Sequence, residues 1–329
     1  MEIDGSVLEG GGQILRIALS LSCILRTPVR IFNIRAGRQK PGLSAQHLKG
    51  VELLRDMTRG KVKGAAFGST ALEFQPGPIQ GGKYFADTET AGSIALLLQV
   101  SLPVAHFSNS STVLDLKGGT NASMAPQVDF LTEIFRPNLE KFGPSFDFNL
   151  FKRGYFPKGG GHCEVHITPV RQIHPCTLTE FGEIKKFFGW SFVAGILPMK
   201  LAYEISEGAK SCLNAFYSPV EIEVYKESPD VATSNCSGII LGCETSTGCI
   251  IGGSALGNRQ ERAQETGKKA AAEVSECVRQ RACVDNFVQD QLIIYMALAN
   301  GISRIKTTKI TLHTRTAIHV VQLMTQVDI

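Results

Sequence analysis

Glycine-rich turns with cations in or near them are the strongest chemical pattern in the sequence. They occupy residues 9–13 (EGGGQ), 40–42 (KPG), 117–120 (KGGT) and 157–161 (PKGGG), and none fits a Walker or dinucleotide-binding motif. Glycine lets a phosphate approach the main chain, where an arginine can bind it with two parallel hydrogen bonds. Glycines that only make tight turns are the alternative. The pattern favours phosphate binding by the turns together with their nearby cations: Arg16, Arg38, Lys40, Lys117, Arg153 and Lys158.

Glu9 stands at the first of these turns, between a predicted strand over residues 2–7 and a predicted helix over residues 13–25. The free N–H groups and the dipole of a helix N-terminus attract phosphate. A carboxylate at that place would repel phosphate unless a divalent cation lay between them, which predicts a Mg²⁺ or Mn²⁺ site at Glu9. An acidic residue that merely stabilises the start of the helix explains the position equally well.

His313 is the candidate nucleophile. It ends a predicted strand over residues 310–313, in which Thr311 and His313 face the same side. A helix is expected to begin within about three residues, capped by Thr314 or Thr316. The positive end of that helix would favour neutral imidazole, which is the nucleophilic form. A lone histidine is more often structural, so the pattern alone leaves both roles open.

The elements that would position these residues alternate strands with amphipathic helices. Strands, helices and hairpins are expected in the order β-α-β-α-β-β, first over residues 2–74 and again over residues 83–167, with a kink at Pro137 in the last helix. Two successive units near 80 residues each predict helices layered on mixed sheets, an α/β or α+β fold.

A different pattern occupies the stretch from residue 182 to residue 280. Strands are expected at residues 220–224, 238–242 and 249–252, before a charged helix over residues 261–278. A helix over residues 288–298, a strand over 305–313 and a helix over 316–326 would then complete the first part. The sequence thus predicts a large discontinuous domain, residues 1–181 plus 281–329, with a smaller α/β domain inserted at residues 182–280.

The composition is that of a globular protein. Of the 329 residues 43% are hydrophobic and 19% charged, and the net charge of +4 permits a polyanionic ligand without resembling a protein that coats long nucleic acid. Nine scattered cysteines without a C-x-x-C pair predict reduced, mostly buried thiols rather than zinc ligands. The acidic, glycine-rich N-terminus and the interrupted apolar stretch at residues 91–105 predict a soluble, intracellular protein with no membrane partner.

Several segments carry a resemblance to a known family. They are DGS and EGGGQILR near the N-terminus, RAGR, PGL and QHL, KGGTN, RGYFPKGGG, and DQL, MALA and TLHT near the C-terminus. Together they resemble the RNA 3′-terminal phosphate cyclase family over nearly the whole chain. RGYFPKGGG is the most specific segment, and ETSTGC and GISRIKT are similar to the animal members.

The resemblance implies a mechanism. His313 would attack the α-phosphate of ATP, release pyrophosphate and form a covalent histidine–AMP. AMP would pass to the RNA 3′-phosphate, and the neighbouring 2′-hydroxyl would displace it to close a 2′,3′-cyclic phosphate. Covalent catalysis splits one hard displacement into easier ones, and the last step is intramolecular. ATP as co-substrate, Mg²⁺ or Mn²⁺, RNA 3′-phosphate ends as partner and a location in the nucleoplasm follow from the same resemblance, while monomer and homodimer stay open.

The resemblance also assigns residues. Glu9 would hold the metal, and Glu9, Arg16, Arg38 and His313 would be catalytic. The ATP site would comprise Gln99, Pro126, Phe287, Asp290, Gln291 and His313, and the RNA end would meet Gln13, Arg16, Arg38 and Gln46. Two features depart from the family pattern. Phe287 stands where tyrosine is usual, so a ring remains but a hydroxyl contact is lost. The family also continues beyond the position of Ile329 into a strand-containing tail, whose absence is expected to reduce stability before chemistry.

Two other functions fit parts of the pattern. A non-catalytic relative acting in ribosomal RNA maturation would share the fold but lack the nucleophilic histidine, so the presence of His313 weighs against it. An enolpyruvyl-type transferase would share the repeated β-α-β-α-β-β units, but fold similarity alone is weak evidence for function. Such an enzyme needs no covalent nucleotide, so labelling with ATP distinguishes it from a cyclase.

Overall fold

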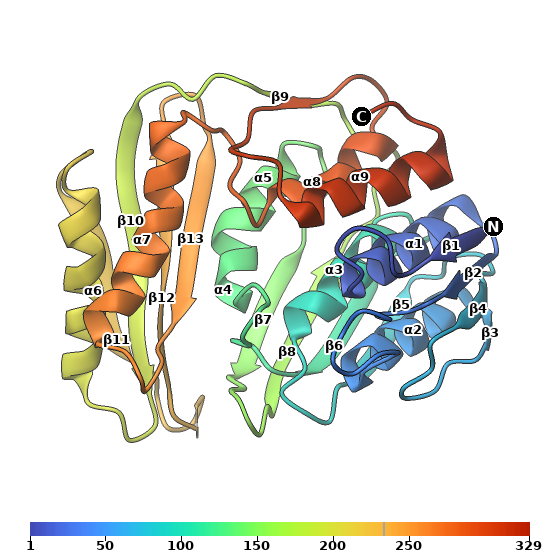
Figure 1. Ribbon diagram of the computed structural model, residues 1–329, viewed down its shortest axis with the longest axis horizontal. Helices are drawn as coiled ribbons and strands as arrows, with labels where there is room; N and C mark the ends of the chain where they lie inside the picture. The colour runs from blue at the N-terminus through green and yellow to red at the C-terminus, as the bar shows by residue number, and fades with distance from the viewer. Residues whose placement is uncertain (233) are drawn as a thin grey trace.

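A computed structural model describes residues 1–232 and 234–329. The described chain is a mixed α/β structure in which strands form four small sheets with helices packed against them (Figure 1). The mixed α/β class expected from the sequence is therefore confirmed. Within these residues, no helix is long and apolar enough to cross a membrane.

The N-terminal sheet is built in the order expected from the sequence. Its elements are β1 (Glu2–Asp4), α1 (Gly12–Leu25), β2 (Val29–Phe32), α2 (Ala45–Thr58), β3 (Lys61–Lys63) and β4 (Leu72–Gln75). The strands lie in the order β1-β2-β4-β3, with β1 parallel to β2 and β4 antiparallel to both of its neighbours. Alternate residues such as Ile3, Ile31 and Leu72 are buried, because successive side chains of a strand face opposite sides.

The second sheet follows the same order of elements. These are β5 (Gly82–Asp87), α3 (Ile94–Ala105), β6 (Thr112–Gly118), the continuous helical segment α4 (Val128–Phe130), η1 (Leu131–Phe135) and α5 (Arg136–Glu140), β7 (Asp147–Lys152) and β8 (Gly161–Ile167). The strand order is β5-β6-β8-β7. The kink expected at Pro137 takes the form of a π-helical turn just before it, since proline lacks the N–H and clashes with the carbonyl four residues earlier.

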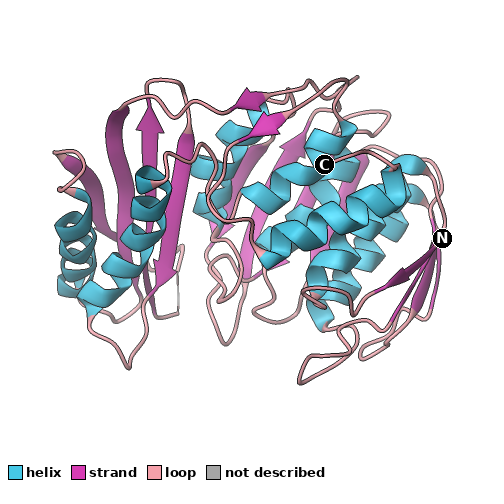
Figure 2. Ribbon diagram, turned by 45° about the horizontal axis from the view of Figure 1, so that its top comes forward, coloured by secondary structure: helices cyan, strands magenta, loops and turns pink. Residues whose placement is uncertain are grey.

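The third sheet includes the long strand β10 (Ile184–Ala194), and the helix α6 (Met199–Leu213) packs against it. The sequence predicted neither of these two elements. The sheet also contains β11 (Val220–Lys226), β12 (Cys236–Thr245) and β13 (Ile250–Leu256), in the order β11-β10-β12-β13, and is followed by α7 (Ala263–Arg279). Figure 2 shows α6 and α7 side by side against this sheet. The two helices can approach closely because Gly267 has no side chain. A Cβ at that position would lie 1.9 Å from the carbonyl oxygen of Ile205.

The C-terminal segment corrects one expectation. It contains α8 (Gln289–Leu298), β14 (Arg304–Ile305) and α9 (Leu312–Thr325), and β14 pairs with the short β9 (Thr177–Leu178). The strand expected over residues 305–313 is wrong beyond Ile305, and His313 does not end a strand. The side chain of Thr311 instead accepts the N–H of Thr314 and starts α9 there, so His313 lies in the first turn of a helix. Helix α9 packs between α1 and α8 (Figure 1).

Candidate active site

The N-terminal ends of several helices meet at one place beside α1. Gln13, in the first turn of α1, donates from Nε2 to the carboxylate of Asp290 in the first turn of α8, at 2.7 Å. Gln46, in the first turn of α2, accepts the N–H of Ser93, the N-cap of α3, at 2.8 Å. Each helix start carries partial positive charge and free N–H groups, so their convergence makes a strong place for phosphate.

Glu9 ties the first turn of glycines to α9. Its N–H donates to Thr316 Oγ1 at 3.2 Å, which fixes the loop against the helix that carries His313. Its carboxylate forms a close ion pair with Arg38, and Arg38 also donates to the main-chain oxygen of Glu9 at 3.2 Å. The Glu9 side chain is only 10% exposed. The structure therefore brings Glu9, Arg38 and the helix that carries His313 together.

Arg16 lies between Gln13 and the solvent side of the site. Its Nη2 donates to Gln13 Oε1 at 2.9 Å, and Gln13 Nε2 in turn donates to Asp290. Burial lowers the pKa of Arg16 to about 10, so it stays charged at neutral pH. Burial raises the pKa of Asp290 to about 7, which the charge of Arg16 counteracts in part. Among the described residues Arg16 Nε has no hydrogen-bond partner, so this cation is held ready but incompletely satisfied.

A cavity with about 520 Å³ of empty space, part of it open solvent, lies beside this chain of polar groups. Its lining includes the polar residues Gln13, Arg16, Gln99, Asp290 and Gln291 and the apolar residues Leu102, Leu131 and Phe135. A largely apolar cleft with few polar groups is the usual form of a small-molecule site. Arg16 also borders a second cavity of about 250 Å³, where it faces Gln46 and His47.

His313 is exposed in the first turn of α9, yet the surrounding protein lowers its pKa. Desolvation is the largest cause, and the positive charges of Arg16 and Arg38 act in the same direction. A lowered pKa keeps the imidazole neutral at pH 7 and therefore nucleophilic. The sequence argument reached the same protonation state from a helix that was expected to start later.

His47 belongs to the site, although the residue pattern alone gave it no chemical role. Its Nδ1 accepts the N–H of Ser44 at 3.3 Å and lies 2.8 Å from Ser44 Oγ, an arrangement that closes the start of α2. Burial, followed by Arg16 and Arg35, lowers the pKa of His47 to about 3, so it is neutral. A Cβ on Gly12 would lie 2.4 Å from His47 Nε2 and 2.7 Å from Arg16 Nη1. The missing side chain of Gly12 therefore gives these two groups their room.

Asp285 is a second residue that the sequence did not single out. Its Oδ1 accepts the N–H groups of Phe287 and Val288 at 2.9 Å each, and its Oδ2 accepts that of Gly252 on β13, also at 2.9 Å. Because the side chain is fully buried, its pKa is raised to about 6. These bonds shape the turn before α8 and so position Asp290. The sequence signal for this role was an aspartate a few residues before a predicted helix, where its short side chain can accept backbone N–H groups at the helix start.

Three residues of the predicted ATP site do not line the 520 Å³ cavity: Pro126, Phe287 and His313. Phe287 is 37% exposed and packs edge-to-face on Phe130, with ring centroids 5.8 Å apart. Pro126 stands on the loop before α4, and His313 is exposed in the first turn of α9. The structure thus gathers Gln13, Gln99, Asp290 and Gln291 around one space, while these three are not among the residues that line it.

The residues present can accommodate one divalent cation. Among residues 1–232 and 234–329 no cluster of three or more His, Cys, Asp or Glu side chains could hold a metal alone. Within the same residues, Oε2 of Glu9 is buried and lacks a hydrogen-bond partner. Mg²⁺ is typically held by one or two carboxylates, with substrate phosphates and water completing its shell. A single buried carboxylate oxygen beside a phosphate site fits that mode of binding.

Comparison with known proteins identifies the class. A family model described as RNA 3′-terminal phosphate cyclase matches residues 7–329. The RNA 3′-terminal phosphate cyclase of Drosophila melanogaster is 43% identical over 329 residues, covering 99% of this chain and 91% of the fly protein. The protein of the same name from Pyrococcus furiosus is 39% identical over 321 residues, covering 97% and 92%.

The chain belongs to the RNA 3′-terminal phosphate cyclase family. The cyclase of Pyrobaculum neutrophilum, 38% identical over 322 residues with 98% and 92% covered, supports the same assignment. The resemblance drawn from the motifs is confirmed, and similarity over the full length of the chain supports RNA 3′-terminal phosphate cyclase activity.

Proposed function

We propose that this chain uses ATP to convert an RNA 3′-terminal phosphate into a 2′,3′-cyclic phosphate, with His313 as the nucleophile. The single observation that carries the role of His313 is its place in the first turn of α9, where desolvation, Arg16 and Arg38 together keep its imidazole neutral. A ring nitrogen attacks the α-phosphorus, the bond to the β-phosphate oxygen breaks, and pyrophosphate leaves.

Arg16 and Arg38 stabilise the negative charge that grows on the phosphorus in that step. Arg16 is preorganised by Gln13, and Arg38 by Glu9, so little rearrangement is required when the phosphate arrives. The second half of the reaction transfers AMP to the RNA 3′-phosphate. The adjacent 2′-hydroxyl then attacks the activated phosphorus, and AMP leaves with the electron pair of the broken bond.

The two cavities divide the substrates. The 520 Å³ space, with Gln99, Asp290 and Gln291, takes the adenosine. The 250 Å³ space, with Gln46 and His47, receives the RNA 3′-phosphate. Arg16 borders both cavities, so it can contact the α-phosphate of AMP as AMP is transferred to the RNA 3′-phosphate. Glu9 Oε2 would hold a Mg²⁺ or Mn²⁺ ion, which supplies charge neutralisation for the triphosphate when bound.

The chain organisation supports a large unit with an insertion. The elements of the first two sheets run in the same order, β-α-β-α-β-β, and the third sheet lies entirely within residues 184–256. These observations support residues 1–181 and 281–329 as one discontinuous domain and residues 182–280 as the insertion. A nucleoplasmic location is a further proposal, and it rests on the family resemblance alone.

The decisive test is incubation with α-labelled ATP and magnesium. The wild type is expected to form an acid-labile, alkali-stable protein–AMP adduct, and His313→Ala to form none. His319→Ala is the matched control, because His319 is an exposed histidine on the same helix. A folded wild type that forms no adduct, with or without RNA, would contradict the proposal and favour a non-catalytic RNA-binding role.

A further inference from the structure

The loop of residues 153–161, which carries the RGYFPKGGG segment, buries one aromatic ring and exposes the next. Tyr155 is 2% exposed and stacks on Phe192 of β10, with ring centroids 6.4 Å apart. Phe156 is 77% exposed, and Lys158 is exposed beside it. The loop thus presents an aromatic ring and a cation to solvent two residues apart.

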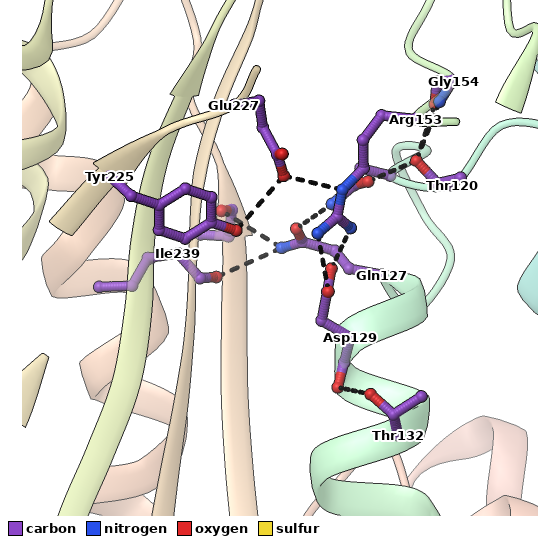
Figure 3. Close-up of polar contacts among 11 residues, drawn as sticks. Thr120, Gln127, Asp129, Thr132, Arg153, Gly154, Tyr225, Glu227 and Ile239 are labelled. Atoms are coloured by element: carbon purple, nitrogen blue, oxygen red, sulfur yellow. Dashed lines mark hydrogen bonds and ion pairs between the residues drawn. The ribbon is translucent and has the colours of Figure 1, made fainter. Parts of the chain in front are cut away.

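The loop is rigid at its base because Arg153 anchors it. Figure 3 shows the Arg153 guanidinium between Asp129 of α4 and Glu227, which follows β11. Its Nη2 donates to Asp129 at 2.9 Å, and its Nε lies 2.8 Å from Glu227 Oε1. The Arg153 N–H also donates to the carbonyl of Val231 at 2.8 Å. The third sheet and its connecting loops therefore support this loop from one side.

On its other side the loop rests against the segment that leads to the RNA-end cavity. A Cβ on Gly159 would lie 2.2 Å from the carbonyl oxygen of Thr90, so only glycine permits this contact. Residue Ser93, three positions later, gives its N–H to Gln46, which lines the cavity. The N–H of Thr120 also donates to Gly154 O at 2.8 Å. The loop is thus linked to Gln46 of the second cavity through the segment of residues 90–93.

We propose that Phe156 and Lys158 form the platform on which the RNA nucleotides preceding the 3′-phosphate rest. A base stacks on the Phe156 ring, and Lys158 contacts a backbone phosphate. This inference rests on the proposed function, and it gives the inserted sheet a role: holding the platform in place. Stacking on an open aromatic ring is tolerant of sequence, because every base offers a π face. Single-stranded RNA fits this surface better than a protein partner, because one ring and one cation lie on a loop whose Gly159 packs against the segment that contacts Gln46.

The test compares a long and a minimal acceptor. The long one is a 3′-phosphorylated decaribonucleotide, and the minimal one is uridine 3′-phosphate, which fills only the phosphate site. Phe156→Ala should lower kcat/KM for the decanucleotide by about tenfold or more and change that for uridine 3′-phosphate by less than about twofold. Phe156→Trp should restore the value for the decanucleotide. Lys158→Ala should reduce the dependence of decanucleotide affinity on salt by about 0.7 in the logarithmic slope, which corresponds to one lost phosphate contact.

Tyr203→Ala and Lys200→Ala are matched controls, because both residues lie on α6 and are largely exposed. If Phe156→Ala behaves like Tyr203→Ala on the decanucleotide, or weakens both acceptors equally, the platform is overturned. Binding of a fluorescent decanucleotide, measured by anisotropy, separates the two proposals. A wild type that cyclises nothing but loses RNA affinity on Phe156→Ala contradicts the proposed function and keeps the platform.

Discussion

Two buried arginines in this molecule have opposite surroundings. Arg153 meets two carboxylates, from Asp129 and Glu227, and although burial acts against it, these charges raise its pKa further above the ordinary value. Arg16 contacts a neutral amide, and burial lowers its pKa to about 10. The charge of Arg153 is neutralised by carboxylates within the protein, whereas the charge of Arg16 remains available for a ligand.

The same contrast extends to the groups around each arginine. Near Arg16, the Oε2 atom of Glu9 and the Nε atom of Arg16 itself lack hydrogen-bond partners among the residues that the structure describes. Arg153 Nε also lacks a hydrogen bond there, but it lies 2.8 Å from Oε1 of Glu227 in an ion pair. Asp290 is held at a raised pKa by burial. Such incompletely compensated groups cost stability, and proteins retain them where a ligand completes the set. Around Arg153 the completed ion pairs serve to hold the architecture together.

The largest effect should come from breaking the completed cluster. Arg153→Ala would leave Asp129 and Glu227 without their shared cation, and removing one partner of a buried pair is destabilising by about 3–5 kcal/mol. The free energy of unfolding, measured with urea, should fall by this amount. Arg30→Ala removes a cation from an exposed pair with Glu2 and should change it by less than about 1 kcal/mol. Equal losses in the two variants would contradict the contrast.

The next effect should be on catalysis with little loss of stability. Arg16→Ala removes a preorganised cation from the transferred phosphate and should lower the rate of protein–AMP formation by roughly 10²–10³-fold. Its charge is poorly compensated in the folded state, so the unfolding midpoint should change far less than in Arg153→Ala. A large loss of stability with normal adduct formation would assign Arg16 to the structure rather than to the reaction.

The sequence predicted the helices around the site well but misplaced the proposed nucleophile, His313. Residues 13–25 and 288–298 were expected to be helical and are so to within one residue, because apolar periodicity marks such segments. His313 was assigned to a strand since Ile310, Thr311 and Leu312 favour extended structure. The hydrogen bond from Thr314 N–H to Thr311 Oγ1 starts a helix at this point instead. This cap was difficult to predict because several threonines stand close together in the sequence.

Contacts between distant segments were beyond the reach of the sequence. Arg153 was interpreted as a possible phosphate ligand because of the glycines that follow it, but its partners come from Asp129 and Glu227, which no local spacing connects to it. The strand β10 was missed because two lysines precede its apolar residues and Gly189 interrupts them. His47 and Asp285 likewise acquire their roles from neighbours that only the fold supplies.

The smallest expected effect is a change in the pH dependence of stability. The pKa of Asp290 is raised from 3.8 to about 7, so between these values the folded state binds a proton that the unfolded state has released. Stability from this group is therefore present at low pH and is lost as pH rises toward 7. Asp290→Asn keeps an oxygen for the Gln13 N–H but cannot ionise, so its stability should fall less steeply from pH 4 to pH 7.

Urea unfolding of both proteins across this pH range measures the difference, which should be on the order of a few kcal/mol at most. Asp285, with a pKa raised to about 6, titrates in both proteins and gives the decline that remains in the variant. Parallel curves for wild type and Asp290→Asn would show that Asp290 is compensated as completely as the carboxylates around Arg153. The contrast between the two arginine clusters would then rest on Arg16 alone.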